Sequence, residues 1–252
     1  MGVSAAALLA LRLLAPAQGQ IFGALPQLPA GETVRVDDLV AALREIADAQ
    51  RDDPDVQADW AALVERHGLR DDDDARREYA RVRLLFESTR DGGLWNLHWD
   101  ITNRAPNSDA IWAQWRAHDD YDGRVASATA ECDELSALFA HLAHRMGVRH
   151  VGLLWPVWNH VVAVWTVPGE HGDVRIVVPT SQIMLDDEQT LGTTEFDPMR
   201  QRRIYDYRRR DAADGLRLPR ALAADFVLRS WYDGGRPAAT LQRDRTARSA
   251  RL

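Results

Sequence analysis

Cys132, the single cysteine of the chain, and His160, at the start of an apolar run, are the residue types of a nucleophile and its general base. A cysteine attacks a carbonyl carbon as the thiolate, and an imidazole within hydrogen-bonding distance can accept the thiol proton. The two side chains can act together only if the elements that carry them pack against each other. The helix predicted around Cys132 and the strand predicted at His160 therefore decide whether this chemistry is possible.

Cys132 begins a predicted amphipathic helix. Apolar residues follow it at three- and four-residue steps, which is typical of a helix with one buried stripe: Leu135, Leu138, Phe139, Leu142 and Met146. Cys132 falls on the same stripe, so we expect the thiol to face the interior. Thr129 is the predicted N-cap, and Gly147 is predicted to end the helix. Free backbone N–H groups at the helix start favour a thiolate, whereas the acidic residues of the first turn oppose it.

His160 begins the first strand of a predicted antiparallel hairpin. The predicted elements of this region are strands at 148–156, 160–167 and 174–178 and a turn at 168–173. Alternation places Val162 and Val164 on the face of His160, with Val161 and Ala163 on the other face. Because both sets are apolar, we expect the sheet to be covered on both sides. We expect the Cys132 helix on the side that carries His160.

The order of these features is similar to that of a known family. A cysteine at the start of a leucine-rich helix, a helix end of the form Arg145-Met146-Gly147-Val148 and a strand that begins with histidine resemble the bacterial transglutaminase-like, or papain-like, cysteine peptidases. The resemblance covers roughly residues 130–180. It implies an α+β fold in which the cysteine-bearing helix packs on an antiparallel sheet. It also implies that Cys132 attacks an amide carbonyl and that His160 accepts the thiol proton.

The third member of the site is where the sequence departs from the family. The family places an aspartate in an Asp-Pro-Thr motif at the end of the next strand, whereas the matching stretch here is Val178-Pro179-Thr180. Valine cannot orient an imidazole. Gln182, Asp173 and Asn159 are the alternatives. We take Gln182 first, because an amide can hold a histidine in the required tautomer, as cysteine-histidine-asparagine sites do.

The resemblance implies a thiol-dependent amide hydrolase or acyl transferase that acts on peptide or isopeptide bonds and needs no cofactor. Trp158 and Asn159, next to His160, are the predicted substrate-binding residues, because an aromatic side chain beside a cleft suits peptide recognition. The stretch Asp122-Gly123-Arg124 precedes the cysteine helix, where related folds place groups that stabilise an oxyanion. The expected partner is a peptide or protein substrate.

Two other hypotheses stay open. A missing aspartate is also what a catalytically inactive binding module on the same fold would show, one that binds peptide or glycan ends. Alternatively, Cys132 is only a small buried hydrophobic residue, and His160 is a histidine satisfied within the core. Substitution of Cys132 by alanine abolishes turnover under the first hypothesis, spares folding and binding under the second and mainly lowers stability under the third.

His141 and His144, in the predicted helix, do not indicate a metal site. At about 100° per residue both lie away from the apolar stripe, so we expect them to face solvent. Zinc needs three or four ligands that converge on one point. We therefore expect no metal.

The composition fits one compact domain of enzyme size. The chain has 252 residues, of which 46% are hydrophobic and 27% charged, enough to bury a substantial core. The domain is assigned to residues 32–235 and a polar, arginine-rich tail to residues 236–252. Apolar periodicity predicts an N-terminal helical layer, and the acidic run at Asp71–Asp74 is predicted to start its third helix. The helices of this layer are predicted around 36–46, 60–64 and 79–86.

Residues 1–20 have two interpretations. An apolar stretch followed by small residues resembles an export signal. However, no basic residue precedes the stretch and Arg12 interrupts it, so a helix of the mature protein is the second interpretation. The first interpretation predicts an exported protein and the second a cytoplasmic one. No stretch is apolar enough over the length of a membrane span. The formal net charge of -7 argues against a nucleic-acid partner, and the oligomeric state stays open.

Overall fold

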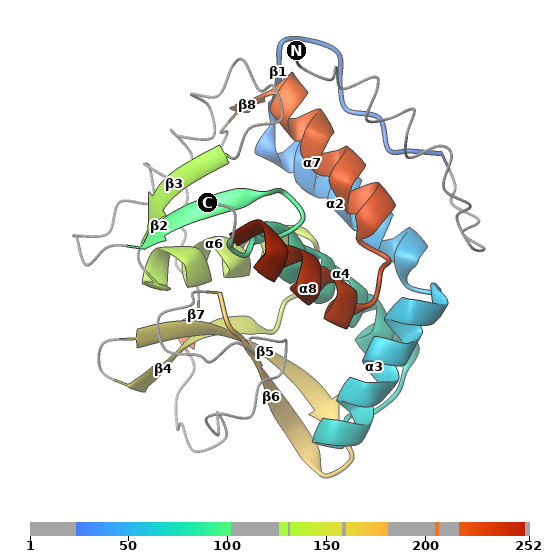
Figure 1. The fold of residues 1–252 in the computed structure, drawn as a ribbon. Helices are drawn as coiled ribbons and strands as arrows, with labels where there is room; N and C mark the ends of the chain where they lie inside the picture. The colour runs from blue at the N-terminus through green and yellow to red at the C-terminus, as the bar shows by residue number, and fades with distance from the viewer. Residues whose placement is uncertain are drawn as a thin grey trace.

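The computed structural model describes residues 24–101, 126–130, 132–157, 160–180, 205–206 and 217–249. Within these ranges the fold is α+β, as predicted, with helices packed against a mainly antiparallel arrangement of strands (Figure 1). The helices are α2 (Val36–Gln50), α3 (Pro54–His67), α4 (Asp73–Thr89), α6 (Cys132–Arg145), α7 (Arg220–Asp233) and α8 (Ala238–Ser249). The strands are β1 (Thr33–Arg35), β2 (Leu97–Ile101), β3 (Ala126–Ala130), β4 (Val151–Val157), β5 (His160–Gly169), β6 (Gly172–Val178), β7 (Tyr205–Asp206) and β8 (Arg217–Pro219).

The predicted N-terminal helices are present as α2, α3 and α4, and local signals explain where they begin and end. Asp53 caps α3 by accepting a hydrogen bond from the N–H of Asp55 at 3.0 Å. Gly68 follows α3 with a φ of 62°, a left-handed conformation that glycine adopts without strain. Asp72 accepts from the N–H of Ala75 at 2.9 Å, so the acidic run does start the third helix.

The main sheet has the strand order β6-β5-β4-β7, and its neighbouring strands are antiparallel. The predicted hairpin is present as β5 and β6, in register from Ala163 opposite Val178 to Gly169 opposite Gly172. The connection is tighter than predicted, because strand pairing continues to Gly169 and the positive φ of Gly172, 128°, allows the chain to reverse there. This register determines which residues lie near the start of β5.

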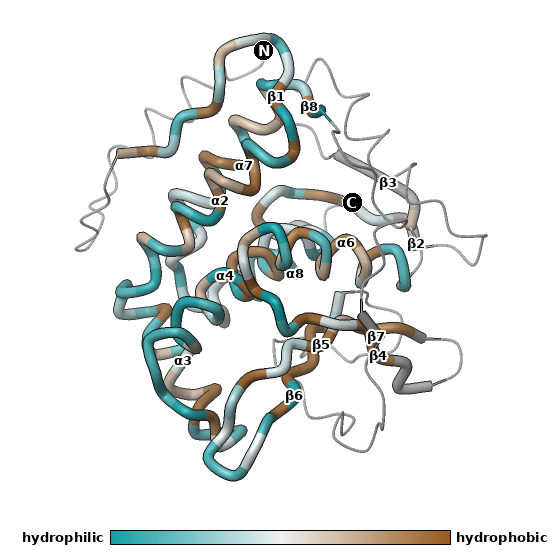
Figure 2. The backbone as a smooth tube through the Cα atoms, turned by 180° about the vertical axis from the view of Figure 1, so that it is seen from behind, coloured by the Kyte–Doolittle hydropathy of each residue, from teal (hydrophilic) through white to brown (hydrophobic). Residues whose placement is uncertain are grey.

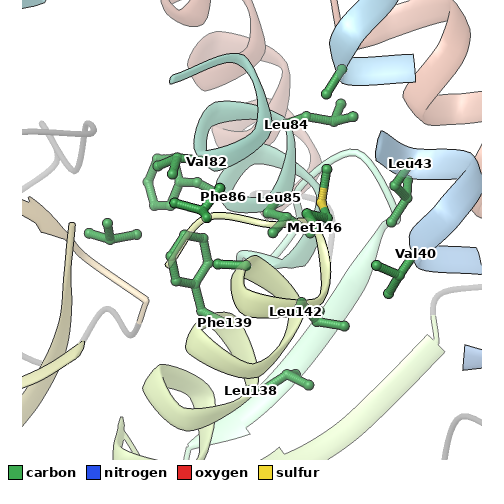
Figure 3. Packing of buried hydrophobic residues seen from close by; sticks show 14 of the residues in the cluster. Val40, Leu43, Val82, Leu84, Leu85, Phe86, Leu138, Phe139, Leu142 and Met146 are labelled. Carbon is green, nitrogen blue, oxygen red and sulfur yellow. The ribbon is translucent and has the colours of Figure 1, made fainter. Parts of the chain in front are cut away.

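Helix α6 lies between the main sheet and the N-terminal helices (Figure 1). Figure 3 shows Phe139 and Leu142 of α6, and Met146 directly after it, beside Leu85 and Phe86 of α4. All five side chains are buried, and complete burial of a side chain of this size contributes about 1.5–3 kcal/mol. The hydrophobic colour in Figure 2 continues along β4 and β5, whereas the tip of the β5–β6 hairpin is hydrophilic. Packing on two sides therefore holds α6 in place.

Both faces of β5 are buried, as predicted, but α6 packs on the opposite face to the predicted one. Val161 and Ala163 belong to the same buried cluster as Cys132. Val162 and Val164 belong to a separate buried cluster. The prediction that the Cys132 helix covers the face assigned to position 160 together with Val162 and Val164 is therefore wrong, because α6 packs on the face of Val161 and Ala163. Alternation determines which residues share a face of a strand, but the choice of the face that meets a helix depends on packing between distant segments.

The C-terminal part forms a second helix in the stretch that the sequence assigned to a polar tail. Helix α7 begins after Pro219. Helix α8 follows it, and its Leu241 is buried in the main cluster. The N–H of Ala238, the first residue of α8, donates to Oδ2 of Asp59 in α3 at 2.9 Å. A polar segment with so little apolar periodicity has no helix signal of its own, so α8 depends on these distant partners.

Candidate active site

Cys132 is the first residue of α6, as predicted, and it is 8% exposed. The predicted N-cap, Thr129, is wrong: Thr129 lies in β3, where its backbone pairs with Asp100 of β2. The chain stays extended through Ala130 because β3 pairs in parallel with β2 up to that residue. Strand pairing between distant segments therefore delays the helix start beyond the local capping signal.

His160 is the first residue of β5, and its backbone pairs with Val157 at the end of β4. The structure describes His160 through its backbone only. Figure 1 shows the start of α6 and the start of β5 on the same side of the molecule. The two predicted site residues are therefore at the ends of elements that meet.

Ser136, in α6, joins the two elements. Its Oγ lies 2.7 Å from the carbonyl oxygen of Cys132 and 3.2 Å from the carbonyl oxygen of Val161, the residue after His160. The same Oγ lies 2.7 Å from Oγ1 of Thr180, which follows β6. All four residues are buried. The first turn of α6, the start of β5 and the end of β6 thus converge on one hydroxyl group.

The protons of this junction can be assigned by counting donors. Both carbonyl oxygens can only accept, and a serine hydroxyl has one proton to donate. Ser136 therefore donates to the carbonyl of Cys132, the nearer of the two, and shares this proton with the carbonyl of Val161. Thr180 donates its own proton to the Ser136 oxygen. Every polar group of the junction is then satisfied, as buried hydroxyls require.

The position of the family's aspartate is occupied by a core residue. Val178 is 0% exposed, lies opposite Ala163 and belongs to the cluster that contains Cys132. The valine side chain has no polar group that could bind an imidazole. Val178 is therefore a core residue.

Asp173, one of the alternative orienting residues, is too far from His160. Asp173 is exposed and pairs with Pro168, at the hairpin end of β5. His160 is eight residues away along the same strand, and at about 3.3 Å per residue the separation is roughly 26 Å. Asp173 is therefore eliminated. Gln182, Asn159 and Trp158 lie outside the described residues, as do residues 122–124.

The two helical histidines have different environments. His141 is 6% exposed, so the prediction that it faces solvent is wrong. Because α6 is packed both by the sheet and by other helices, its buried surface extends well beyond the apolar stripe. His144 is exposed, and its Nε2 lies 2.8 Å from the carbonyl oxygen of Val151. This contact connects the end of α6 with the start of β4.

The described part of the chain contains neither a metal-binding cluster nor a membrane-spanning helix. No group of three or more histidine, cysteine, aspartate or glutamate side chains there is arranged to hold a metal ion. Among the helices described, none combines the length and the apolar character needed to cross a membrane.

Ser136 and Thr180 were not predicted as site residues from the sequence. A weak signal was present in each case: Ser136 is a polar residue four positions after Cys132 among apolar ones, and Thr180 closes the Val-Pro-Thr stretch. Their contact cannot be inferred from the sequence, because it joins residues that are 44 positions apart.

Comparison of the chain with models of protein families, with curated proteins and with solved structures found no match. The resemblance to transglutaminase-like peptidases is therefore carried by the residues of this chain alone.

Proposed function

We propose that the protein is a thiol-dependent amide hydrolase or acyl transferase that acts on peptide or isopeptide bonds, with Cys132 as the nucleophile and His160 as its base. The observation that supports this function is the Ser136 junction, which joins the first turn of α6 to the start of β5. The packing of a cysteine-bearing helix on antiparallel strands also supports the proposal, because the resemblance to transglutaminase-like peptidases implies such a core.

In the proposed reaction, His160 takes the proton of the Cys132 thiol and the sulfur attacks the amide carbonyl carbon. A carbon–sulfur bond forms, and the carbonyl oxygen becomes an oxyanion that donors at the positive end of the α6 dipole would stabilise. The carbon–nitrogen bond then breaks, and the amine leaves with the proton from His160. Water or a second amine attacks the resulting thioester, which regenerates the thiol. No metal or cofactor takes part.

The proposal gives Gln182 the task of orienting His160, because Val178 cannot do so and Asp173 is too far away. Trp158 and Asn159 are proposed to contact the substrate on the approach to His160. Hydrolysis is favoured over transfer because water is always present as the acceptor.

A second candidate function is a binding module that has lost catalysis. The burial of Val178 in the apolar core, at the position of the family's aspartate, favours it. In that case the same surface binds peptide or glycan ends, and Cys132 has the reactivity of an ordinary buried thiol.

The pH dependence of Cys132 alkylation by iodoacetamide separates these functions. A nucleophilic pair requires labelling of the folded protein with an apparent pKa well below the ordinary thiol value of about 8.5. This low apparent pKa is expected to be lost in His160→Ala and retained in His171→Ala, which removes an exposed histidine at the hairpin tip. An ordinary apparent pKa that His160→Ala does not change supports the binding module. Labelling that occurs only on unfolding identifies Cys132 as a structural residue and rejects the enzyme.

A further inference from the structure

We propose that Ser136 and Thr180 are positioning residues of the candidate active site, whose paired hydroxyls fix the start of α6 relative to the start of β5. The proposal rests on the proposed function, because it assigns to this pair the geometry between Cys132 and His160. Neither residue is expected to touch the substrate.

Ser136 is a polar residue at a fully buried helical position. The neighbouring buried positions carry Leu135, Ala137 and Leu138. Alanine has a higher helix propensity than serine, and a serine that bonds back to the carbonyl four residues earlier slightly destabilises a helix. Packing alone therefore does not account for Ser136. Its hydroxyl is accounted for by its reach to Val161, in a different element, at 3.2 Å.

Thr180 lies just beyond β6, which ends at Val178. Backbone pairing between β5 and β6 ends with Ala163 opposite Val178. The next residue, Pro179, has no N–H and cannot extend the ladder. The hydroxyl pair of Thr180 and Ser136, at 2.7 Å, connects the chain directly after β6 with the helix that carries Cys132.

The two hydroxyls are coupled. Ser136 has one proton, which it donates to the carbonyls of Cys132 and Val161, so its contact with Thr180 needs a proton from Thr180. Removal of either hydroxyl therefore weakens the same junction, and a displacement of about 1 Å between reacting groups can reduce a rate by about a hundredfold.

The experiment measures the pH profile of Cys132 alkylation together with the urea midpoint of unfolding. Ser136→Ala removes the central hydroxyl, Thr180→Val removes its donor with little change of shape, and Thr180→Ser restores the donor. Ser230→Ala is the matched control, because Ser230 is also fully buried and hydrogen-bonded. Its partners are the hydroxyl of Ser88 and the N–H of the Trp95 side chain, which are not part of the junction.

We expect Ser136→Ala and Thr180→Val to slow alkylation at pH 7 by about tenfold and to move its apparent pKa toward that of an ordinary thiol. Thr180→Ser is expected to keep the wild-type profile. Ser230→Ala is expected to lower the urea midpoint without any change of the profile. If Ser136→Ala fails to fold, the comparison of Thr180→Val with Thr180→Ser decides the question.

Two results would overturn the proposal, and they are distinguishable. If the wild type shows the low apparent pKa but Ser136→Ala and Thr180→Val keep it, the hydroxyl pair is only structural and the proposed function stands. If the wild type is labelled only on unfolding, the proposed function fails and the positioning role fails with it.

Discussion

The guanidinium group of Arg83 in α4 donates from Nη1 to the backbone carbonyl of Gly234, just after α7, at 2.5 Å. Arg83 is 3% exposed, and its Nη2 also donates to the carbonyl of Arg236 and to Oδ2 of Asp59, the latter at 3.0 Å. The same Asp59 oxygen accepts from the N–H of Ala238, where α8 begins. One buried cation therefore connects α3 and α4 with the two C-terminal helices.

Replacement of Arg83 by methionine should destabilise the protein by about 3–5 kcal/mol, because it removes the donor to the carbonyls of Gly234 and Arg236 and the cation that is paired with the partly buried Asp59. The matched control is Arg77→Met, which breaks an ion pair with Asp74, whose side chain is 88% exposed. That change should alter stability by less than about 0.5 kcal/mol. Urea unfolding followed by circular dichroism measures both values, and a loss below about 1 kcal/mol for Arg83→Met would contradict the connection described above.

Gly93→Ala should destabilise the protein by about 2 kcal/mol or more through steric overlap. A Cβ at Gly93 would lie 2.3 Å from the carbonyl oxygen of Glu87 and 2.8 Å from that of Arg90, both rigid backbone atoms of the α4 end. The control is Gly68→Ala, where no atom lies within 4 Å and only the left-handed φ is unfavourable, at about 1 kcal/mol. Thermal unfolding of the two variants compares these costs. Equal losses would show that the overlap at Gly93 is relieved without cost.

The stability of the protein should depend on the ionisation of Asp71. Its carboxylate accepts from Nε of Arg76 at 2.7 Å and from Nε1 of Trp60 at 2.8 Å, and these bonds hold the pKa of Asp71 below its ordinary value of 3.8. Since the pKa is lowered in the folded state, the stabilisation is present above the ordinary value and is lost as the pH falls through the lowered one.

Asp71→Asn should therefore be less stable than the wild type at neutral pH, by less than about 1 kcal/mol because the ion pair is exposed. Asparagine keeps an oxygen that can accept from Trp60, so the comparison isolates the charge. The difference should disappear in acid. Urea midpoints measured from neutral to acidic pH at low salt test this, and a difference that persists after Asp71 is protonated would exclude ionisation as its cause.

Val178→Asp should restore the family's Asp-Pro-Thr motif in sequence but destabilise the fold by about 3 kcal/mol or more at neutral pH. The carboxylate would replace a side chain that is 0% exposed in the apolar core, where a charge without a partner is costly. The loss should become smaller in acid, because burial raises the pKa of a carboxyl group and the neutral form is tolerated better. Val174→Asp, at a partly buried position of the same strand, should cost less. A Val178→Asp variant as stable as the wild type would instead show that position 178 faces a polar site.

Much of the secondary structure could be predicted because its signals are local. The helix that begins at Cys132, the hairpin that begins at His160 and the start of α4 in the acidic run depend on residues only a few positions apart. Helix α8 could not be predicted, because what holds it is Asp59 in α3 and the burial of Leu241 rather than a pattern of its own. The same limit explains His141, which is buried because α6 is packed on more than one side.

The candidate site was predictable in part for the same reason. The two reactive residue types and their order are properties of the sequence, and so is the absence of an aspartate at position 178. The elimination of Asp173 needed the strand register, which places it at the far end of β5. The hydroxyl pair of Ser136 and Thr180 needed the packing of α6 on the sheet.

By itself the sequence determined the residue types available for chemistry, the local periodicities and the residues that share a face of β5, because each of these depends on near neighbours in the chain. Only the tertiary structure decided that α6 meets the face of Val161 and Ala163, and that Ser136 joins Cys132 to the start of β5. These contacts bring together residues far apart in sequence. They are selected by the burial and hydrogen bonding of the whole fold, and no single segment contains the information that specifies them.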